Sequence, residues 1–277
     1  MKKAKKGSLI IGIIFLIVAF GFVLYPLISN TINNCFALST IDNYKSKVAD
    51  LKDSKSRYLT DAEEYNHNLS KLVNDFTYSS DSVIDGYDNI LNFGDGLIGY
   101  IDIPKINVKL PIYHGDTDKV LEKGVAHIPN TAFPIGGIGN HSVLSAHTGY
   151  PTQVFFDNLN DLAIGDEIKV SVLDETLIYK VTAKNIVKPD DISLLSVDDR
   201  KDLISLITCY PYGVNSHRLI VTAERLSEMS STTDETKSSI DENTISPILV
   251  IVVVAILIVS ATVMLFIRKI KRKTKNE

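Results

Sequence analysis

Two long uncharged stretches dominate the pattern of hydrophobic and polar positions. Residues 9–28 and residues 248–267 each form a run of 20 positions without a charged side chain. A helix of about 20 such residues crosses a bilayer core of about 30 Å. We therefore predict two transmembrane helices. A cleaved signal peptide is the alternative for the first stretch, but its apolar run is longer than the usual hydrophobic region of about 7–15 residues.

Basic residues flank both stretches on the sides that face away from the middle of the chain. Four lysines precede residue 9, and residues 268–277 contain six basic side chains. Such flanks stay in the cytoplasm. We therefore predict two-pass topology, with cytoplasmic tails at residues 1–8 and 268–277 and an extracellular segment over residues 29–247. A buried core helix is the alternative for residues 248–267, but the run is apolar on all sides and ends in basic residues, which disfavours it.

The segment at residues 29–94 begins with helical periodicity and continues into loop composition. Apolar side chains recur at spacings of three and four in two sets. The first set is Ile41, Tyr44, Val48 and Leu51, and the second is Tyr58, Ala62, Tyr65, Leu69 and Leu72. Thr60 and Glu63 form a capping box, which predicts that a second helix starts near Asp61. We expect an extracellular helical arm that is either a spacer or packs on the next domain.

Residues 95–227 change to short β-branched runs that are separated by turns. The runs are LIGYIDI, VKLPIY, HSVLSAH, EIKVSVL, LIYKVTAKNIV, LISLITC and HRLIVTA. At least seven strands at this spacing predict an all-β barrel or sandwich. Residues 228–247 are rich in serine, threonine and acidic side chains, so we predict a polar linker without a core of its own.

Composition and charge narrow the class of protein. With 277 residues, 45% of them hydrophobic, the chain is neither disordered nor collagen-like. The formal net charge of −4 divides into +4 for residues 1–7, +5 for residues 268–277 and −13 for the residues between them. An acidic exterior gives no reason to expect nucleic-acid binding. No cluster of metal ligands stands out, so we expect no required cofactor.

Cys209 is one of two cysteines, which are too few for a disulfide-rich scaffold or a multi-cysteine zinc site. It ends the apolar run LISLITC, whereas Cys35 follows the first transmembrane stretch. Three interpretations of Cys209 are open: an inert core thiol, a disulfide partner of Cys35, or a nucleophile. A nucleophilic thiol needs a base or a cation nearby to favour the thiolate.

The sequence contains candidates for both the cation and the base. If the runs ending at Cys209 and beginning at His217 form a hairpin, Arg218 returns beside Cys209, where its guanidinium can stabilise a thiolate or an oxyanion. A plain surface charge is the alternative for Arg218. His147 ends the run HSVLSAH and enters a turn, which is a favourable position for a cleft. His217 neighbours Arg218, but adjacent strand residues point to opposite faces.

These segments resemble the sortase family. TCYPYGVNSHRLIV at residues 208–221 is similar to the sortase cysteine and arginine signature, with Ser205 in place of its first threonine. LSAHTGYP at residues 144–151 resembles the catalytic histidine segment of the family. GYIDIPKINVKLPIYHG and GVAHIP resemble its first barrel strands and the loop that follows. The resemblance covers roughly residues 95–225 and implies a sortase β-barrel of about eight mixed strands.

The resemblance also implies roles and a subclass. Cys209 would be the nucleophile, His147 the general acid and base, and Arg218 the ligand of the oxyanion or substrate carbonyl, with Thr208 at the substrate. The helical arm, PYGVNSHRL and the second transmembrane stretch resemble class C, pilus-assembling sortases. Many of these carry an Asp-Pro-aromatic lid. This chain has Asp75 and Phe76 without the proline, so they form either a looser lid or an ordinary loop.

The implied activity is transpeptidation at the outer membrane surface. Cys209 would cleave a Leu-Pro-x-Thr-Gly-like signal between threonine and glycine and pass the acyl group to a pilin lysine or a cell-wall amine. The implied partners are secreted pilins or surface proteins with C-terminal sorting signals. Three alternatives remain: a wall-anchoring sortase, a cysteine endopeptidase and a non-catalytic, membrane-tethered adhesion domain.

Overall fold

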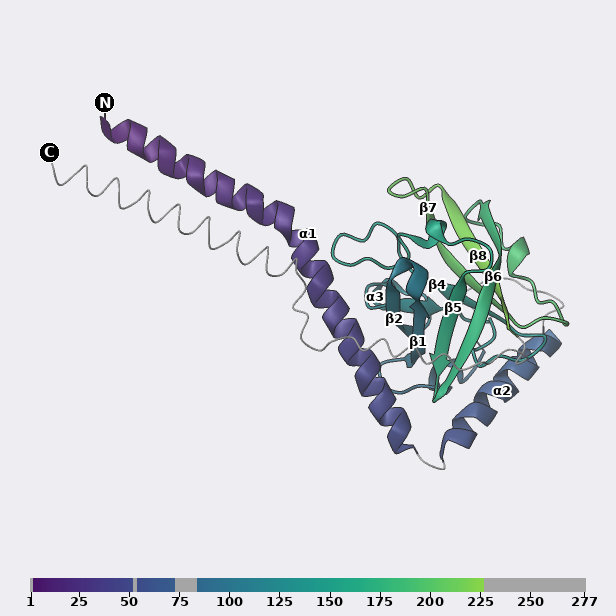
Figure 1. Ribbon diagram of the computed structural model, residues 1–277. Coiled ribbons are helices and arrows are strands. Elements are labelled where there is room, and N and C mark those ends of the chain that lie inside the picture. The colour runs from purple at the N-terminus through teal and green to yellow at the C-terminus, as the bar shows by residue number, and fades with distance from the viewer. Residues whose placement is uncertain (1, 52–53, 73–83, 227–277) are drawn as a thin grey trace. The chain divides into compact units, whose positions relative to one another are not determined.

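Figure 1 shows a computed structural model of the protein, which describes residues 2–51, 54–72 and 84–226. Several sequence predictions lie outside these residues and stay predictions. They concern the linker at 228–247, the second transmembrane stretch at 248–267, the basic tail at 268–277, and the lid residues Asp75 and Phe76.

The first transmembrane stretch and the start of the arm form one continuous helix, α1 (Lys2–Asp50). Within the described residues, one helix is long and apolar enough to cross a membrane, and it lies in this part of the chain. Its large apolar side chains are exposed, among them Phe15 at 70% and Phe22 at 76%. This pattern fits a helix whose surroundings are lipid, and it is consistent with membrane anchoring.

The second helix, α2 (Lys55–Leu72), begins earlier than the sequence predicted. The start near Asp61 is wrong, because Thr60 lies inside the helix. Its hydroxyl donates to the Ser56 carbonyl four residues back at 2.9 Å and does not cap an N-terminus. Serine and threonine can also make this bond inside a helix, so the capping-box pattern was ambiguous.

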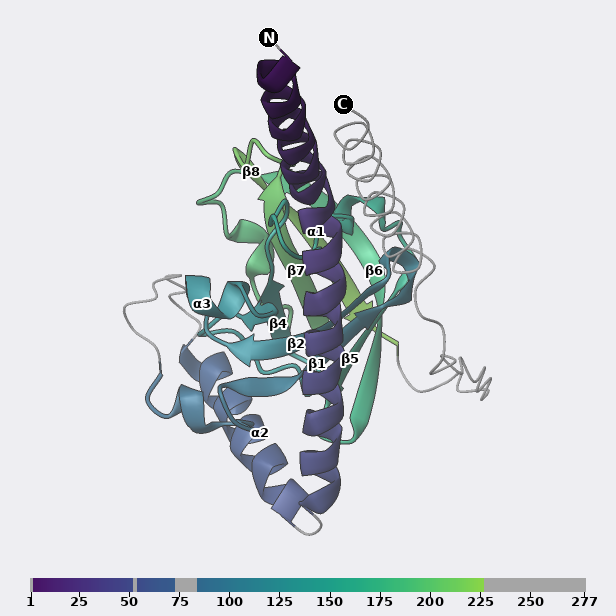
Figure 2. The same cartoon turned by 90° about the vertical axis from the view of Figure 1, so that its left-hand side faces the viewer.

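Both arm helices pack on the β domain, which decides against a free spacer. The predicted face of α1 is buried, with Ile41 and Tyr44 at 1% exposure. The Leu173 amide donates to the Tyr44 hydroxyl at 2.6 Å. On α2, the Asn66 side chain exchanges two hydrogen bonds with the backbone of Phe133. Figure 2 shows α1 running along the barrel in front of β1 and β5.

Eight strands among the described residues close into a barrel, so the predicted all-β core is confirmed as a barrel. They are β1 (Leu97–Ile103), β2 (Val108–His114), β3 (Val125–His127), β4 (His141–Ser145), β5 (Glu167–Val172), β6 (Glu175–Val187), β7 (Leu203–Tyr210) and β8 (His217–Arg225). The order around the barrel is β1-β2-β3-β4-β7-β8-β6-β5. The pairs β2–β3 and β4–β7 are parallel, and the other neighbours are antiparallel.

Short helical pieces precede and connect the strands. The 3₁₀ turn η2 (Tyr87–Asn89) precedes β1, and α3 (Asp118–Leu121) joins β2 to β3. The 3₁₀ turns η3 (Pro104–Ile106), η4 (Leu159–Asp161) and η5 (Ser193–Leu195) lie in other connections between strands. The sequence missed β3 as a strand, because three residues are too few for an alternating pattern to register.

The parallel pair β4–β7 and the hairpin β7–β8 bring the ends of β4 and β7 and the start of β8 to one edge of the barrel.

Candidate active site

Cys209 and Arg218 lie directly opposite each other on neighbouring strands. The hairpin of β7 and β8 pairs Cys209 with Arg218 in its antiparallel register, as the sequence predicted. Both side chains are partly exposed. Residues that face each other in this way have Cβ atoms about 4.5–5.5 Å apart, which is within reach of a long side chain.

His147 continues the parallel ladder on the other side of β7. The register of β4 and β7 ends with Ser145 opposite Ile207, and the Ala146 amide still donates to the Ile207 carbonyl at 3.1 Å. Extending this register by two residues along each chain places His147 beside Cys209. We call His147, Cys209 and Arg218 the candidate row, since they belong to three adjacent segments at one edge of the barrel.

Thr208 links the two chain segments that carry Cys209 and His147. Its side chain is 4% exposed, and its hydroxyl donates to the Ala146 carbonyl at 2.8 Å. The bond ties the residue before Cys209 to the residue before His147. The Thr208 hydroxyl therefore makes a hydrogen bond within the protein. Its predicted contact with substrate stays a prediction.

The loop after His147 holds the imidazole between aromatic rings. Its ring stacks on Tyr150, with centroids 5.3 Å apart and planes 5° apart, and meets the edge of Phe155 at 6.3 Å. The Asp157 carboxylate accepts hydrogen bonds from the amides of Gly149 and Phe155, both at 2.9 Å. A half-buried histidine on a braced loop is well placed to move a proton without changing its position.

Arg218 is held by the turn that precedes it. Its Nη1 donates to the carbonyls of His217 at 3.0 Å and Asn215 at 3.3 Å. Exposed His217 bonds to the Ser216 hydroxyl, which fits the prediction that it faces away from Cys209. A guanidinium has five N–H donors, so these two bonds leave further donors for a substrate oxygen.

Helix α1 contacts the loop that follows His147, a feature that sequence reasoning missed. Asn33 of α1 donates from Nδ2 to the Thr152 carbonyl at 3.0 Å. The Val154 amide donates to Oδ1 of Asn30 at 2.9 Å. Both asparagines follow the apolar stretch within a few residues, so the loop after His147 lies close to the end of that stretch. The sequence signal was a group of asparagines just past the apolar run.

Three histidines outside the site have structural partners. His127 is fully buried, bonds to the Tyr87 hydroxyl and the Ala132 carbonyl, and its pKa is lowered by burial to about 3. Burial also lowers the pKa of His114 and of His141. His141 contacts the Ser205 hydroxyl at 2.8 Å, and Ser205 contacts Thr222 at 3.0 Å. The serine that replaces the signature threonine thus belongs to a buried polar network.

Neither cysteine is in a disulfide, which removes the Cys35–Cys209 pairing as an interpretation. Cys35 is exposed on α1. Throughout the part of the chain that the structure describes, no group of three or more histidine, cysteine or acidic side chains is arranged to hold a metal ion. The groups that the candidate row offers are a thiol, an imidazole and a guanidinium.

Comparison with known proteins gives a consistent result. Residues 101–226 match the sortase domain family. The chain is 32% identical over 115 residues to Sortase D of Bacillus subtilis (strain 168), a match that covers 42% of this chain and 55% of that protein. The chain thus spans about half the length of that relative.

Solved structures match over a longer region. Sortase C1 from Streptococcus agalactiae is 38% identical with a TM-score of 0.63, covering 68% of this chain and 98% of that one. Clostridium perfringens sortase C with its C-terminal cell wall sorting motif is 39% identical with a TM-score of 0.61, covering 69% of this chain and 100% of that one.

Proposed function

The chain belongs to the sortase family, and from this premise we propose that it is a membrane-anchored cysteine transpeptidase of the pilus-assembling class C. The observation that carries the proposal is the pairing of Cys209 with Arg218, with the β4–β7 register leading toward His147 on the other side of β7. These are the nucleophile, the oxyanion ligand and the proton carrier that acyl transfer requires.

In the first half of the reaction, the Cys209 thiolate attacks the carbonyl of the threonine–glycine bond in a Leu-Pro-x-Thr-Gly-like signal. A C–S bond forms, and negative charge develops on the carbonyl oxygen, where Arg218 donates hydrogen bonds. The C–N bond then breaks as the His147 imidazolium gives its proton to the leaving glycine amine. The product on the enzyme is a thioacyl intermediate.

In the second half, an amine replaces the glycine. Neutral His147 accepts a proton from the incoming amine, whose nitrogen attacks the thioester carbonyl. A C–N bond forms, the C–S bond breaks, and the thiolate returns to Cys209. When the amine is a lysine on another pilin, the cycle adds one subunit to a polymer.

Two observations support class C over a housekeeping role. The solved structures that match most of their own length include sortase C1 from Streptococcus agalactiae and sortase C from Clostridium perfringens. The two-helix arm packs on the barrel.

The sorting motif in the Clostridium perfringens structure supports a substrate of the same kind here. Asp75 and Phe76 are proposed as a lid over the row.

The proposed location is the outer face of the membrane, with two passes and both tails in the cytoplasm. The apolar helix α1 and the basic residues on the far side of each uncharged stretch support it. In this location the catalytic domain meets secreted proteins as they emerge. The side-chain contacts of Asn30 and Asn33 hold the His147 loop near that surface.

The test is product analysis of the purified chain with a sorting-signal peptide, with and without an amine acceptor. A transpeptidase gives the amide adduct and consumes little peptide without the amine. Hydrolysis at the same rate under both conditions indicates a cysteine endopeptidase. No cleavage under either condition favours a non-catalytic adhesion domain and refutes the proposal.

A further inference from the structure

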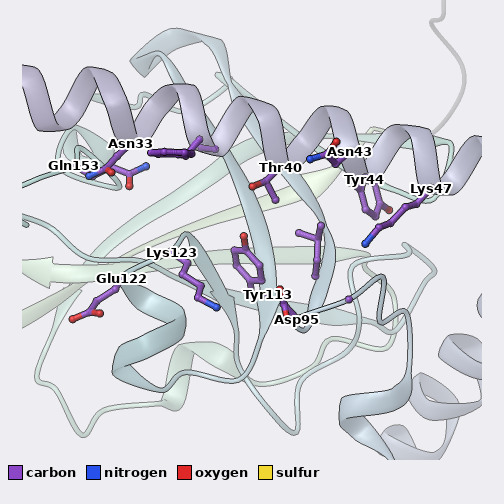
Figure 3. Close-up of a pocket in the computed structure, with 14 residues that line it drawn as sticks. Asn33, Thr40, Asn43, Tyr44, Lys47, Asp95, Tyr113, Glu122, Lys123 and Gln153 are labelled. Atoms are coloured by element: carbon purple, nitrogen blue, oxygen red, sulfur yellow. The ribbon is translucent and has the colours of Figure 1, made fainter.

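A second candidate site lies between α1 and the barrel. It is a cavity of about 550 Å³, lined on one side by α1 from Asn33 to Lys47 and on the other by barrel residues that include Tyr113 (Figure 3). From Asn33 to Lys47 the helix rises about 1.5 Å per residue step, or about 21 Å in all. An extended peptide of about six residues, at about 3.3 Å each, has the same length.

The lining of this cavity is polar and balanced in charge. Lys47 and Lys123 are cationic, whereas Asp95 and Glu122 are anionic. The uncharged polar residues are Asn33, Thr40, Asn43, Tyr44, Tyr113 and Gln153. A phosphate or a lipid headgroup would meet two carboxylates here. A peptide main chain, with alternating donors and acceptors and no net charge, matches such a lining better.

Gln153 gives the cavity an unused hydrogen-bond donor. Its side chain is 5% exposed, and its Nε2 has no hydrogen-bond partner within the described part of the chain. Neighbouring Asn33 already donates its Nδ2 to the Thr152 carbonyl. A buried amide group without a partner is unfavourable, and a carbonyl oxygen of a bound peptide would satisfy it.

The end of the cavity that holds Gln153 is also the end nearest the catalytic histidine. Figure 3 shows Glu122 and Asn33 at this end, with Lys47 at the opposite one. The Glu122 carboxylate lies beside the Tyr150 hydroxyl, and together with burial, the larger cause, it raises the pKa of Tyr150. The Tyr150 ring in turn stacks on His147. A carboxylate beside Tyr150 suits a cationic group on the ligand.

We propose that this cavity binds the acyl acceptor, a polar peptide strand whose lysine side chain passes Glu122 on its way to His147. The inference rests on the proposed transpeptidase function and adds the place where the second substrate binds. Glu122 accepts a hydrogen bond from the lysine ammonium, and Gln153 Nε2 donates to a main-chain carbonyl of the strand. The ammonium first loses one proton to water, and the neutral amine then gives a second proton to His147 as its nitrogen attacks the thioester carbonyl and displaces the Cys209 thiolate.

The experiment compares a large acceptor with a small one, using the full chain in lipid nanodiscs. A sorting-signal peptide forms the thioacyl-enzyme, and either hydroxylamine or an eight-residue lysine peptide resolves it. Hydroxylamine is small enough to reach the thioester without binding in the cavity. Glu122→Gln and Gln153→Leu are compared with Glu167→Gln, a matched change at an exposed glutamate on β5.

We expect Glu122→Gln and Gln153→Leu each to lower the ratio of lysine-peptide transfer to hydroxylamine release by about tenfold or more, as expected for loss of one hydrogen bond to a charged or buried group. A higher KM for the lysine peptide accounts for the loss, and Glu167→Gln keeps the wild-type ratio. An unchanged ratio in Glu122→Gln, a same-size change at an exposed residue, overturns the inference whether or not Gln153→Leu folds. If wild-type enzyme gives no hydroxamate, the proposed function fails instead.

Discussion

Thr208 is predicted to keep His147 level with Cys209, and Thr208→Val removes its hydroxyl while keeping its size. The side chain is 4% exposed and bonds to the Ala146 carbonyl at 2.8 Å. Removing one partner of a buried hydrogen bond costs about 1–3 kcal/mol of folding free energy. A misplacement of about 1 Å at a reacting group lowers the rate by about 100-fold, so a partial shift of His147 should slow acylation by about tenfold.

The assay pairs urea unfolding with single-turnover acylation by a sorting-signal peptide. Thr208→Ser is the matched control, because it keeps the hydroxyl and removes only a methyl group. Valine should lower both the free energy of unfolding and the acylation rate, whereas serine should preserve the rate. If Thr208 acts only on substrate, valine raises KM without loss of stability. Valine and wild-type enzyme that are equal in stability and rate refute the reasoning.

The remaining predictions concern the oxyanion ligand, acid stability and the lid. Arg218→Lys should lower the acylation rate by about 100-fold, because an ammonium lacks the planar fork that places donors on an oxyanion; His217→Ala is the control, and equal losses in both variants contradict this role. Burial lowers the pKa of His127 to about 3, so the unfolded chain binds more protons and the urea midpoint should fall as pH drops below about 6.5. His127→Gln should flatten that dependence, and an unchanged slope contradicts it. Asp75→Ala should speed labelling of Cys209 by a thiol reagent, and an unchanged rate leaves residues 74–76 as plain loop.

Much of the fold could be predicted from the sequence, because alternation is a local signal. The run LIGYIDI coincides with β1 (Leu97–Ile103), and the other six predicted runs contain or overlap β2 and β4–β8. The three residues of β3 were missed, since pairing with β2 and β4 and not local pattern makes them a strand. The start of α2 was also misplaced, because one threonine can cap a helix or bond back within it.

The site was predictable where it depended on one hairpin and not where it depended on distant segments. The opposition of Cys209 and Arg218 followed from two adjacent runs and a short turn. The contacts of Asn30 and Asn33 with the His147 loop join positions more than 100 residues apart, and no local pattern announces them. The same holds for Thr208 and Ala146, whose bond depends on the parallel pairing of β4 with β7.

The central claim is that Cys209 carries the acyl group, and peptide mapping of the trapped intermediate tests it most directly. The purified chain is incubated with a sorting-signal peptide without an amine, quenched in acid, digested and examined by mass spectrometry. The account predicts the Leu-Pro-x-Thr acyl mass on the peptide that contains Cys209, its loss in Cys209→Ala, and its retention in Cys35→Ala. An adduct on Cys35, or full polymerising activity in Cys209→Ala, would contradict it.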